Sequence, residues 1–570
     1  MTAAIHPLEP RGTVSADIRL PDIALWRRFD IEHAEVWCAG TADRDLGRKI
    51  VAALDTENPG ESVAAALRDL PTQFAIIVRS GPRLVCAVDR IRSIPLIWSK
   101  APNGAIVIAQ QGDALFDGLA AQGAPRPTVD MRQAKAVAMS GYTIGPATLY
   151  HGVAGLLAGE FLMVHDGQEP VTLPYFRYLP WRTVPASPVA EAESSEALGE
   201  ILLNALKDTV RKADGRCIAV PLSAGLDSRY VVSGLKELGY ENVLCFSYGQ
   251  DGNREAQAAR KIAQELGYPW VFQPYELGAM QSAFRGAGYK AFVDYSDSLT
   301  AVHFPQDFIA ISELLARGDL PPDAMVVNGQ SGDYLTGNHI PASLADLSTG
   351  DTADIRQVVS ALLSKHFALW GQLQVPAQQA IVENLLKEEF DLLTSGAPPM
   401  KAGDLFGLFE ASEYVDRQSK YVVNGQRSYE KLGLDWDLPL WHGDLIDFYA
   451  AQPLTAKRGQ KLYRDTLMRM NWQGVWRDIP VNATRLRPWW LPPVRNAMKL
   501  LHAPLGRDAW HRFERRYLGY FMSTLCAYAV RRWSEVARDT RNPRSAMAYH
   551  VEDYLLRHGV TMTDVEEAGR

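Results

Sequence analysis

The feature that most constrains the fold of this chain is a short apolar run that ends in a loop of small residues and continues into a helical pattern. The run is Ile218–Leu222, the loop is Ser223–Ser228, and helical spacing extends from Val231 to Leu238. An apolar run this short is typical of a buried strand, so the segment predicts a strand–loop–helix unit. In such a unit the loop N–H groups and the helix N-terminus form a cradle for a phosphate group.

The side chains of this loop indicate how it would bind a phosphate. Ser223 and Ser228 add hydroxyl donors, and Asp227 lies between them in sequence. Because a carboxylate repels a bare anion, we expect Asp227 to hold a divalent cation that neutralises the phosphates. The chain has no G-x-x-x-x-G-K motif, so this is not a Walker loop. Taken alone, the segment could also be an ordinary β–α turn.

A second strand is predicted to end in a similar turn. The apolar run Ala324–Val327 continues into a Gly-rich segment that contains one carboxylate, Asp333. Two strand ends that each offer one Asp suit Mg²⁺, which binds a few carboxylates together with phosphate oxygens. Either Asp alone could form a turn or cap a helix, but the pair in this order favours a metal site.

Both segments resemble motifs of the asparagine synthetase family. Residues 223–228 are similar to S-G-G-x-D-S, the pyrophosphate loop of its ATP pyrophosphatase domain, with Ala224 at the first Gly, and residues 328–337 are similar to S-G-E-G-A-D-E-L-F-G-G. The resemblance implies ATP and Mg²⁺ as cofactors, with Asp227 and Asp333 as catalytic metal ligands. Gln330 and Tyr334 replace two family glutamates, which leaves the second substrate open. The nucleotide-binding residues implied are Leu222, Ser223, Ala224, Gly225, Leu226, Asp227, Ser228, Tyr248, Asn328 and Gly329.

A third resemblance concerns a catalytic lysine. Lys461–Asp465 is similar to the family's K-x-x-L-R-E, whose Lys neutralises charge as the carboxylate attacks ATP, so Lys461 is the implied catalytic residue. The spacing to Arg464 is one residue short, and Lys457 remains a rival. The preceding segment, Arg417–Pro453, resembles the family's helical region around E-x-R-x-P-F-L-D.

Strands and helices alternate after the first loop. Val243–Gly249 and Trp270–Phe272 are predicted strands, and Glu255–Leu266 between them is a predicted amphipathic helix with Gly267 as its C-cap. This alternation predicts an α/β domain with a doubly wound parallel sheet, whose ligands bind at the carboxyl ends of the strands.

The N-terminal part predicts a different architecture. Phe74–Val78 and Leu84–Val88 form a hairpin pattern, and Asp89–Trp98 resembles a stretch of the glutamine amidotransferase domain of asparagine synthetases. The resemblance implies an Ntn-type sandwich of antiparallel sheets. The family's glutaminase needs a Cys directly after the initiator Met, and this chain has Thr2 there. We therefore expect a degenerate domain, with an N-terminal nucleophile role of Thr2 as the alternative.

These patterns predict four regions: a degenerate amidotransferase-like domain over 1–178, a linker over 179–195, a ligase domain over 196–475 and a basic, aromatic extension over 476–570. From Arg485 to Glu535 the extension has ten Lys/Arg against three Asp/Glu. It is interpreted as a helical face packed on the ligase domain. The alternative is a seat for an acidic partner, such as a nucleotide diphosphate or an anionic membrane surface.

Charge and cysteine usage limit the class of protein. A net charge of −7 argues against a nucleic-acid partner. Five scattered cysteines predict neither structural zinc nor disulfides, and Cys38 and Cys86 are predicted core residues. We find no signal peptide and no apolar run long enough to span a membrane. We expect a cytoplasmic protein, with peripheral membrane contact and a homodimer left open.

The predicted function is that of an ATP-dependent carbon–nitrogen ligase. A small-molecule carboxylate would be adenylated with release of pyrophosphate, and ammonia or an amine would then displace AMP, with a separate ammonia source left open. Three segments look most like the branch found with bacterial surface-polysaccharide genes, where uronic acids become uronamides: Ser298–Asp307, Gly337–Ile340 and Arg417–Lys420.

The alternatives are a lasso-peptide or β-lactam type cyclase, an inactive binding protein and a tRNA-modifying pyrophosphatase. The intact Asp pair disfavours the second, and the acidic charge disfavours the third.

Overall fold

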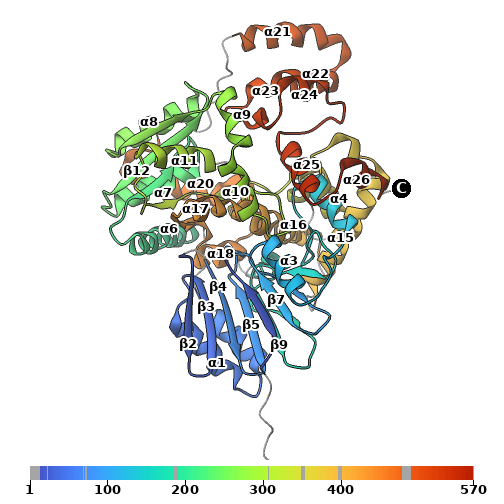
Figure 1. Cartoon of the computed structure of the whole chain (residues 1–570). Coiled ribbons are helices and arrows are strands. Elements are labelled where there is room, and N and C mark those ends of the chain that lie inside the picture. The colour runs from blue at the N-terminus through green and yellow to red at the C-terminus, as the bar shows by residue number, and fades with distance from the viewer. Residues whose placement is uncertain are drawn as a thin grey trace, which may run out of the picture. The chain divides into compact units, whose positions relative to one another are not determined.

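The computed structural model describes residues 13–21, 24–68, 70, 73–183, 191–305, 307–347, 353–395, 401–477 and 490–568. The chain divides into two compact units (Figure 1). The N-terminal unit comprises residues 1–130, 146–177 and 298–300, and the C-terminal unit comprises 131–145, 178–297 and 301–570. The predicted Thr2 nucleophile and residues 184–190 of the predicted linker lie outside the described residues.

The N-terminal unit contains two sheets. Six strands form an antiparallel sheet in the order β10-β9-β5-β4-β3-β2, and four form a second sheet in the order β1-β7-β6-β8. The predicted hairpin is β4–β5, in which Val78 pairs with Val85. One pairing, β1 with β7, is parallel in this otherwise antiparallel unit. The elements are β1 (Ala16–Arg19), β2 (Trp26–Ile31), β3 (Ala34–Gly40), α1 (Arg44–Leu54), α2 (Pro59–Arg68), β4 (Phe74–Ser80), β5 (Arg83–Val88), β6 (Ile97–Lys100), β7 (Ile106–Ala109), α3 (Gly112–Ala121), β8 (Val153–Gly155), β9 (Glu160–His165) and β10 (Val171–Pro174).

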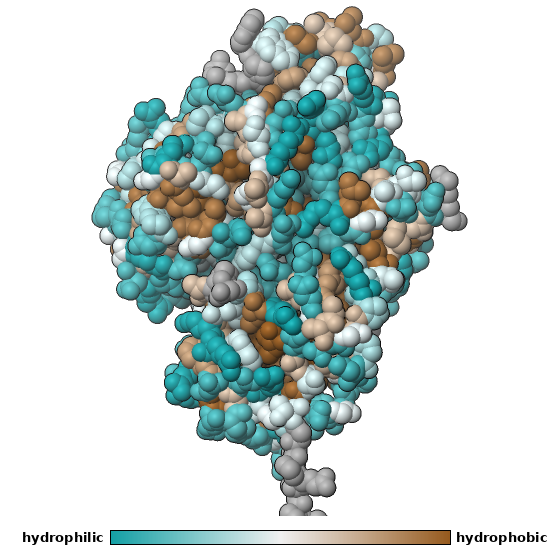
Figure 2. Space-filling view, viewed as in Figure 1, coloured by the Kyte–Doolittle hydropathy of each residue, from teal (hydrophilic) through white to brown (hydrophobic). Residues whose placement is uncertain are grey.

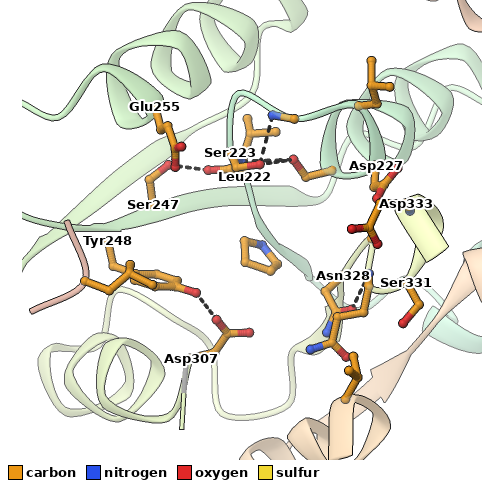
Figure 3. Close-up of a pocket in the computed structure, with 18 of the residues that line it drawn as sticks. Leu222, Ser223, Asp227, Ser247, Tyr248, Glu255, Asp307, Asn328, Ser331 and Asp333 are labelled. Atoms are coloured by element: carbon orange, nitrogen blue, oxygen red, sulfur yellow. Dashed lines mark hydrogen bonds between the residues drawn. The ribbon is translucent and has the colours of Figure 1, made fainter. Parts of the chain in front are cut away.

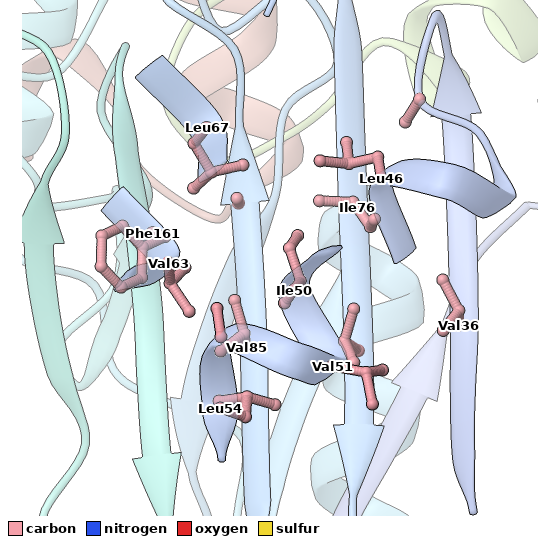
Figure 4. Close-up of a cluster of buried hydrophobic side chains, with 14 of the residues drawn as sticks. Val36, Leu46, Ile50, Val51, Leu54, Val63, Leu67, Ile76, Val85 and Phe161 are labelled. Carbon is pink, nitrogen blue, oxygen red and sulfur yellow. The ribbon is translucent and has the colours of Figure 1, made fainter. Parts of the chain in front are cut away.

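The core of this unit lies between the six-stranded sheet and helices α1 and α2. Figure 4 shows Ile50 and Leu54 of α1 and Val63 of α2 packed on the sheet. Cys38 and Cys86 are buried, as predicted, and burial raises the pKa of the Cys38 thiol to about 12. Both thiols are therefore protonated packing groups.

The C-terminal unit is built on a parallel five-stranded sheet in the order β13-β12-β11-β14-β15. The chain runs from β11 outward to β12 and β13 and then returns to the other side of β11 to form β14. This reversal of direction creates a switch point between β11 and β14, where doubly wound sheets bind their ligands. Ile218 pairs with Met325 and Ala219 with Val326, so the loops that follow the two strands lie side by side. The strands are β11 (Ile218–Pro221), β12 (Val243–Gly249), β13 (Trp270–Pro274), β14 (Met325–Val327) and β15 (Asp435–Asp437).

Helices cover the sheet and extend beyond it. Ile311, Leu314 and Tyr429 pack on one face, and the Tyr230 hydroxyl donates to the Leu202 carbonyl at 2.8 Å between two helices of the other layer. The α-helices are α4 (Met131–Ser140), α5 (Pro180–Thr183), α6 (Glu191–Ala213), α7 (Leu226–Glu237), α8 (Arg254–Leu266), α9 (Leu277–Arg285), α10 (Ala287–Tyr295), α11 (Phe308–Arg317), α12 (Gly332–Leu335), α13 (Ala342–Ala345), α14 (Ile355–Lys365), α15 (Pro376–Thr394), α16 (Leu405–Glu413), α17 (Arg427–Lys431), α18 (Gly443–Ala450), α19 (Leu454–Lys457), α20 (Lys461–Met470), α21 (Leu491–His502), α22 (Arg507–Phe513), α23 (Gly519–Met522), α24 (Trp533–Arg538), α25 (Met547–Arg557) and α26 (Met562–Glu567).

Short 3₁₀ segments and two π-helices complete the unit. The π-helices are η3 (Tyr414–Val422) and η9 (Glu514–Leu518). The 3₁₀ segments are η1 (Gly371–Leu373), η2 (Ala402–Asp404), η4 (Val423–Gln426), η5 (Pro439–Trp441), η6 (Arg458–Gln460), η7 (Trp472–Gly474), η8 (Ala503–Leu505) and η10 (Ala527–Val530).

The division into units differs from the predicted regions in two respects. Residues 131–145, predicted in the first domain, belong to the C-terminal unit, and residues 490–568 do not separate from that unit. Helix α4 lies against its partners through polar contacts: Lys135 donates to Gln378, and Gln378 donates to the Glu566 carbonyl at 2.8 Å. Among the described residues, no helix has both the length and the apolar character needed to cross a bilayer.

Candidate active site

A cavity of about 620 Å³ lies at the carboxyl ends of β11, β12 and β14 (Figure 3). This is the switch point of the sheet. The C-terminal extension also reaches the cavity wall, through Thr524 and Leu525. The lining residues are Pro221, Leu222, Ser223, Gly225, Leu226, Asp227, Ser228, Ser247, Tyr248, Asn253, Glu255, Ala256, Phe304, Asp307, Asn328, Gly329, Gln330, Ser331, Asp333, His339, Arg417, Gln418, Val422, Thr524 and Leu525.

The first loop is held in shape by its two serines. The Ser228 hydroxyl accepts from the Ser223 amide and lies 3.1 Å from the Ser223 hydroxyl, which accepts from the Gly225 amide at 3.1 Å. Gly225 is the N-cap of α7 and offers no side-chain acceptor to the first turn. The N–H groups of that turn therefore have no cap from Gly225, which is the arrangement that binds anions at helix N-termini.

Asp227 and Asp333 meet where the two loops meet. The Asp333 amide donates to Asp227 Oδ2 at 3.2 Å, and the two side chains lie close together in Figure 3. A Cβ on Gly332 would lie 2.5 Å from Asp227 Oδ1, and one on Gly329 would lie 2.7 Å from Asp227 Cβ. The glycines of the second turn are thus required by the close approach of the first loop.

The pKa values of Asp227 and Asp333 reflect two neighbouring carboxylates whose negative charge is only partly balanced by nearby cationic groups. Burial, and then the neighbouring Asp333 charge, raise the pKa of Asp227 to about 7, although the nearby Tyr463 hydroxyl opposes the rise. Burial alone would raise the pKa of Asp333 too, but the hydrogen bond and charge of His339 hold it below its usual value. A cation bound between two carboxylates offsets their mutual repulsion and lowers the raised pKa.

The residues present fit a divalent cation. Asp227 Oδ1 is buried and has no hydrogen-bond partner of good geometry among the described residues. The described ranges hold no group of three or more His, Cys, Asp or Glu side chains placed to bind a metal. A cation at this site would therefore take two carboxylates from the protein and its other ligands from phosphate or water, as Mg²⁺ does.

Next to the Asp pair lies a cluster that sequence reasoning missed. His339 Nε2 donates to Asp333 Oδ2 at 3.1 Å, and Nδ1 donates to Glu413. Burial would lower its pKa, but the charge of Glu413 and the hydrogen bond to Asp333 raise the pKa of His339 to about 9. Arg417 lies 3.6 Å from Glu413. Among the described residues, His339 and Arg417 are the basic side chains that line the cavity.

The opposite wall holds a buried polar network. Asp307 accepts from the hydroxyls of Tyr248 and Tyr429, the latter at 2.6 Å. Tyr429 in turn accepts from Asn328 Nδ2 at 3.1 Å, and Asn328 Oδ1 accepts from the Gln330 amide at 3.0 Å. This network fixes two residues, Tyr248 and Asn328, at which the family resemblance implies nucleotide binding.

Most of the predicted site residues lie on the cavity wall, and three do not. Ala224 is buried away from the cavity, and its carbonyl accepts from Arg229 at 3.2 Å. Lys461 is half exposed and pairs with Asp465 at 3.2 Å. Lys457 is fully buried and pairs with Glu410 at 2.7 Å. Neither lysine lines the cavity, and the catalytic role of Lys461 stays a prediction.

Two arginines of the basic extension, for which a seat for an acidic partner was the alternative, do not line this cavity. Arg515 and Arg516 line a separate cavity of about 100 Å³, where Arg516 donates to the Ala537 carbonyl at 2.7 Å. Arg485 and Arg487 lie outside the described residues.

Comparison with known proteins agrees with the two motifs. Residues 198–457 match the model of the asparagine synthase family. This part of the chain is therefore an asparagine synthetase family domain, as its sequence predicted. No curated protein sequence matches the chain.

Similarity to solved structures is low. An NH₃-dependent NAD synthetase from Campylobacter jejuni subsp. jejuni NCTC 11168 is 14% identical and covers 37% of this chain and 99% of its own, with a TM-score of 0.20. An allosteric regulatory enzyme of purine biosynthesis is 12% identical and covers 43% of this chain and 62% of its own, with a TM-score of 0.18.

Proposed function

We propose that this asparagine synthase domain is an ATP-dependent, AMP-forming amide ligase. The observation that supports this most is the contact between Asp227 and Asp333 at the switch point, beside a loop whose amides and hydroxyls suit a pyrophosphate. A substrate carboxylate would attack the α-phosphorus of ATP with release of pyrophosphate. Ammonia or an amine would then displace AMP to form the amide.

In this reaction the protein would position the ATP phosphates and neutralise the negative charge of the departing pyrophosphate. Mg²⁺ bound by Asp227 and Asp333 would stabilise the charge of the departing pyrophosphate. The Ser223–Ser228 loop would hold the phosphates, and His339 keeps Asp333 oriented and ionised. These roles need little motion of the protein, because hydrogen bonds already hold the Ser223–Ser228 loop in its conformation.

The first test is carboxylate-dependent exchange of labelled pyrophosphate into ATP. We expect Asp227→Asn and Asp333→Asn each to lower the exchange rate by about 100-fold or more, since each removes half of the charge that holds the cation. Asp465→Asn, an exposed carboxylate outside the cavity, is the matched control and should exchange normally. Wild-type exchange in both Asp227 and Asp333 variants would refute the metal assignment.

A second test identifies the cation that faces the attacking carboxylate. Because Arg417 lines the cavity and Lys461 does not, we propose that Arg417 supplies this charge. Arg417→Met should then lose exchange, while Lys461→Met retains it. The reverse result would restore Lys461 to the role that the family resemblance implies.

For the acceptor we propose a sugar uronate. The support is sequence resemblance, and each of the three segments that carry it contributes to the cavity wall, through Asp307, His339 and Arg417. AMP release should be measured with a panel of nucleotide-linked uronates, aspartate and a Glu/Asp-bearing peptide, each with ammonium. Release with the peptide alone would replace the uronate by a cyclase-type substrate.

A further inference from the structure

The part of the chain that carries a second function is the C-terminal cap, defined as residues 490–538. It has a small core of its own, in which Leu491, Trp510 and Leu518 are buried and several other aromatic and Met side chains pack around them. Nine Lys/Arg against three Asp/Glu give the cap a net charge of +6, within a chain whose net charge is −7. The cap is thus folded and opposite in charge to the whole chain.

One end of the cap exposes large apolar side chains. Among the large apolar residues that the structure describes, Leu500 is the most exposed, at 76%, followed by Leu501 and Leu505 at 68% each. These three leucines, the apolar tip, fall within six consecutive residues at the end of α21 and in η8. Figure 2 shows hydrophobic surface over this region, at the top of the view. Scattered single leucines are normal on a surface, but a cluster of the most exposed ones marks an interaction site.

The tip is not exposed by poor packing of α21. Leu491, Arg495, Met498 and His502 are spaced as one helical face and turn inward. Arg495 donates to Glu514 at 2.5 Å, and the His502 ring lies 4.3 Å from the Phe513 ring. This inner face is occupied by the cap core, whereas Leu500 on the opposite side of the helix and Leu501 on its flank are exposed.

The exposure and charge of the tip favour a lipid surface. Every residue from Lys499 to Asp508 is exposed except His502. Leu500 lines a hollow of about 540 Å³, whose other walls include Lys499, Arg507 and Trp510. Lys499 and Arg507 flank the three leucines, and no acidic residue occurs before Asp508. The end of α21 is closed by a hydrogen bond from the Ala503 amide to the Leu500 carbonyl, which meets a requirement for entry into lipid. Apolar side chains flanked by cations bind at the interface of anionic membranes.

We propose that the C-terminal cap docks this protein on an anionic lipid bilayer, with Leu500, Leu501 and Leu505 inserted at the headgroup level and Lys499 and Arg507 contacting lipid phosphates. Because Thr524 and Leu525 of the same cap line the cavity, docking and the proposed active site share one structural element.

The experiment is co-sedimentation of the full chain with vesicles of phosphatidylcholine alone or mixed with phosphatidylglycerol. Binding to the mixed vesicles should be stronger and should fall with added salt. L500S/L501S/L505S should weaken it about tenfold or more, since most of the inserted apolar area is lost. K499Q/R507Q should reduce the preference for phosphatidylglycerol. L556S removes an isolated leucine that is 59% exposed on α25 and is the matched control, expected to bind like the wild type.

Pyrophosphate exchange in the absence of vesicles serves as the check that each variant is folded. The proposal is overturned if the wild-type chain does not sediment with the mixed vesicles, or if the triple serine variant binds as well as the wild type while retaining exchange. It is also overturned if the chain is a dimer without vesicle binding and the triple variant is a monomer, because the tip would then be a contact between two copies.

Discussion

Two glycines set the position of the most important carboxylate in this site. Gly329 and Gly332 lie so close to Asp227 that no side chain fits between the two loops. Neither glycine has an unusual backbone angle in the left-handed region, so the constraint is one of space. The sequence indicated that Asp227 and Asp333 act together, but the closeness of the turn to Asp227 depends on the register of β11 with β14, which no local pattern encodes.

Gly332→Ala tests this constraint. The added Cβ would lie 2.5 Å from Asp227 Oδ1 and must displace either the carboxylate or the turn. We expect exchange of pyrophosphate into ATP to fall by about 100-fold, the cost of a displacement of roughly 1 Å at a reacting site, while the melting temperature changes little. Gly278→Ala is the control, since a Cβ there meets nothing within 4 Å and its helix should tolerate alanine. Equal exchange in the two variants would show that the close approach has no functional weight.

At the scale of elements, the strands that the sequence predicted are those with continuous apolar runs. β4, β5, β11, β12, β13 and β14 all have them. β15 was missed because its sequence, Asp-Trp-Asp, has neither alternation nor an apolar run. Two ion pairs hold β15 in place. Lys212 of α6 pairs with Asp437, and Arg216, in the turn after α6, pairs with Asp435, both at 2.6 Å. Pairings of this kind depend on tertiary neighbours and leave no periodic signal.

The π-helix η3 was also beyond prediction, and it shapes the site. Its winding brings residues five apart onto one side, so Gln418 donates to Glu413 at 3.0 Å and Ser419 to the Tyr414 carbonyl at 2.7 Å. Arg417 and Gln418 then reach the cavity, and the Ser331 hydroxyl donates to Gln418 at 2.7 Å. A search for the usual helical period of 3.6 cannot find this arrangement.

Lys420 is the residue that ties η3 to the segment before β8. Its ammonium is buried and donates to the carbonyls of Thr143 and Gly145 at 2.8 and 2.6 Å and to Asp416 at 2.6 Å. Lys420→Met leaves the Asp416 charge buried without this partner, so we expect the free energy of unfolding to fall by about 3–5 kcal/mol. The urea midpoint of the transition that includes the C-terminal unit should fall accordingly. Lys461→Met, at a half-exposed site, should change the free energy of unfolding by no more than about 0.5 kcal/mol. A Lys420→Met protein as stable as the wild type would mean that Asp416 does not depend on this ammonium.

At the scale of the whole molecule, two buried histidines make stability depend on pH. His303 and His550 lie with their rings 5.4 Å apart, and the Tyr289 hydroxyl is 2.9 Å from His303. Burial, and then the neighbouring His550, lower the pKa of His303 well below 6.5. Burial, with a further contribution from the Arg531 charge, lowers the pKa of His550 to about 4 although Asp553 opposes this. Both side chains are therefore neutral in the folded state near neutral pH.

Below about pH 6.5 the unfolded chain binds protons at these two histidines and the folded chain does not. Stability should be unaffected by them above this pH and should fall by up to about 1.4 kcal/mol per pH unit for each histidine between pH 6.5 and 4. The melting temperature should thus drop on acidification, and His303→Gln/His550→Gln should drop less over the same range. An equal drop in the variant would assign the acid sensitivity to other groups.

The N-terminal unit has the sheets of the predicted domain, yet we expect no glutaminase activity from the chain. The thiol that the family places after the initiator Met is absent, and Cys38 and Cys86 are buried with raised pKa. Incubation of the purified protein with glutamine should release no glutamate, and ammonium should serve as nitrogen donor in its place. Glutamate release that is lost on Thr2→Ala would show that Thr2 acts as the nucleophile.

The assignment of α4 to the C-terminal unit has a consequence for how the chain is made. Helix α4 is complete at residue 140, but it packs with elements that follow much later, since Arg132 pairs with Glu388 at 2.5 Å and Gly141 faces Val551. During vectorial synthesis it leaves the ribosome long before these partners exist, although domains otherwise tend to fold as they emerge. The C-terminal unit can therefore close only after α15 and α25 have been synthesised, and a gene fragment that ends between α4 and α25 would not encode this unit intact.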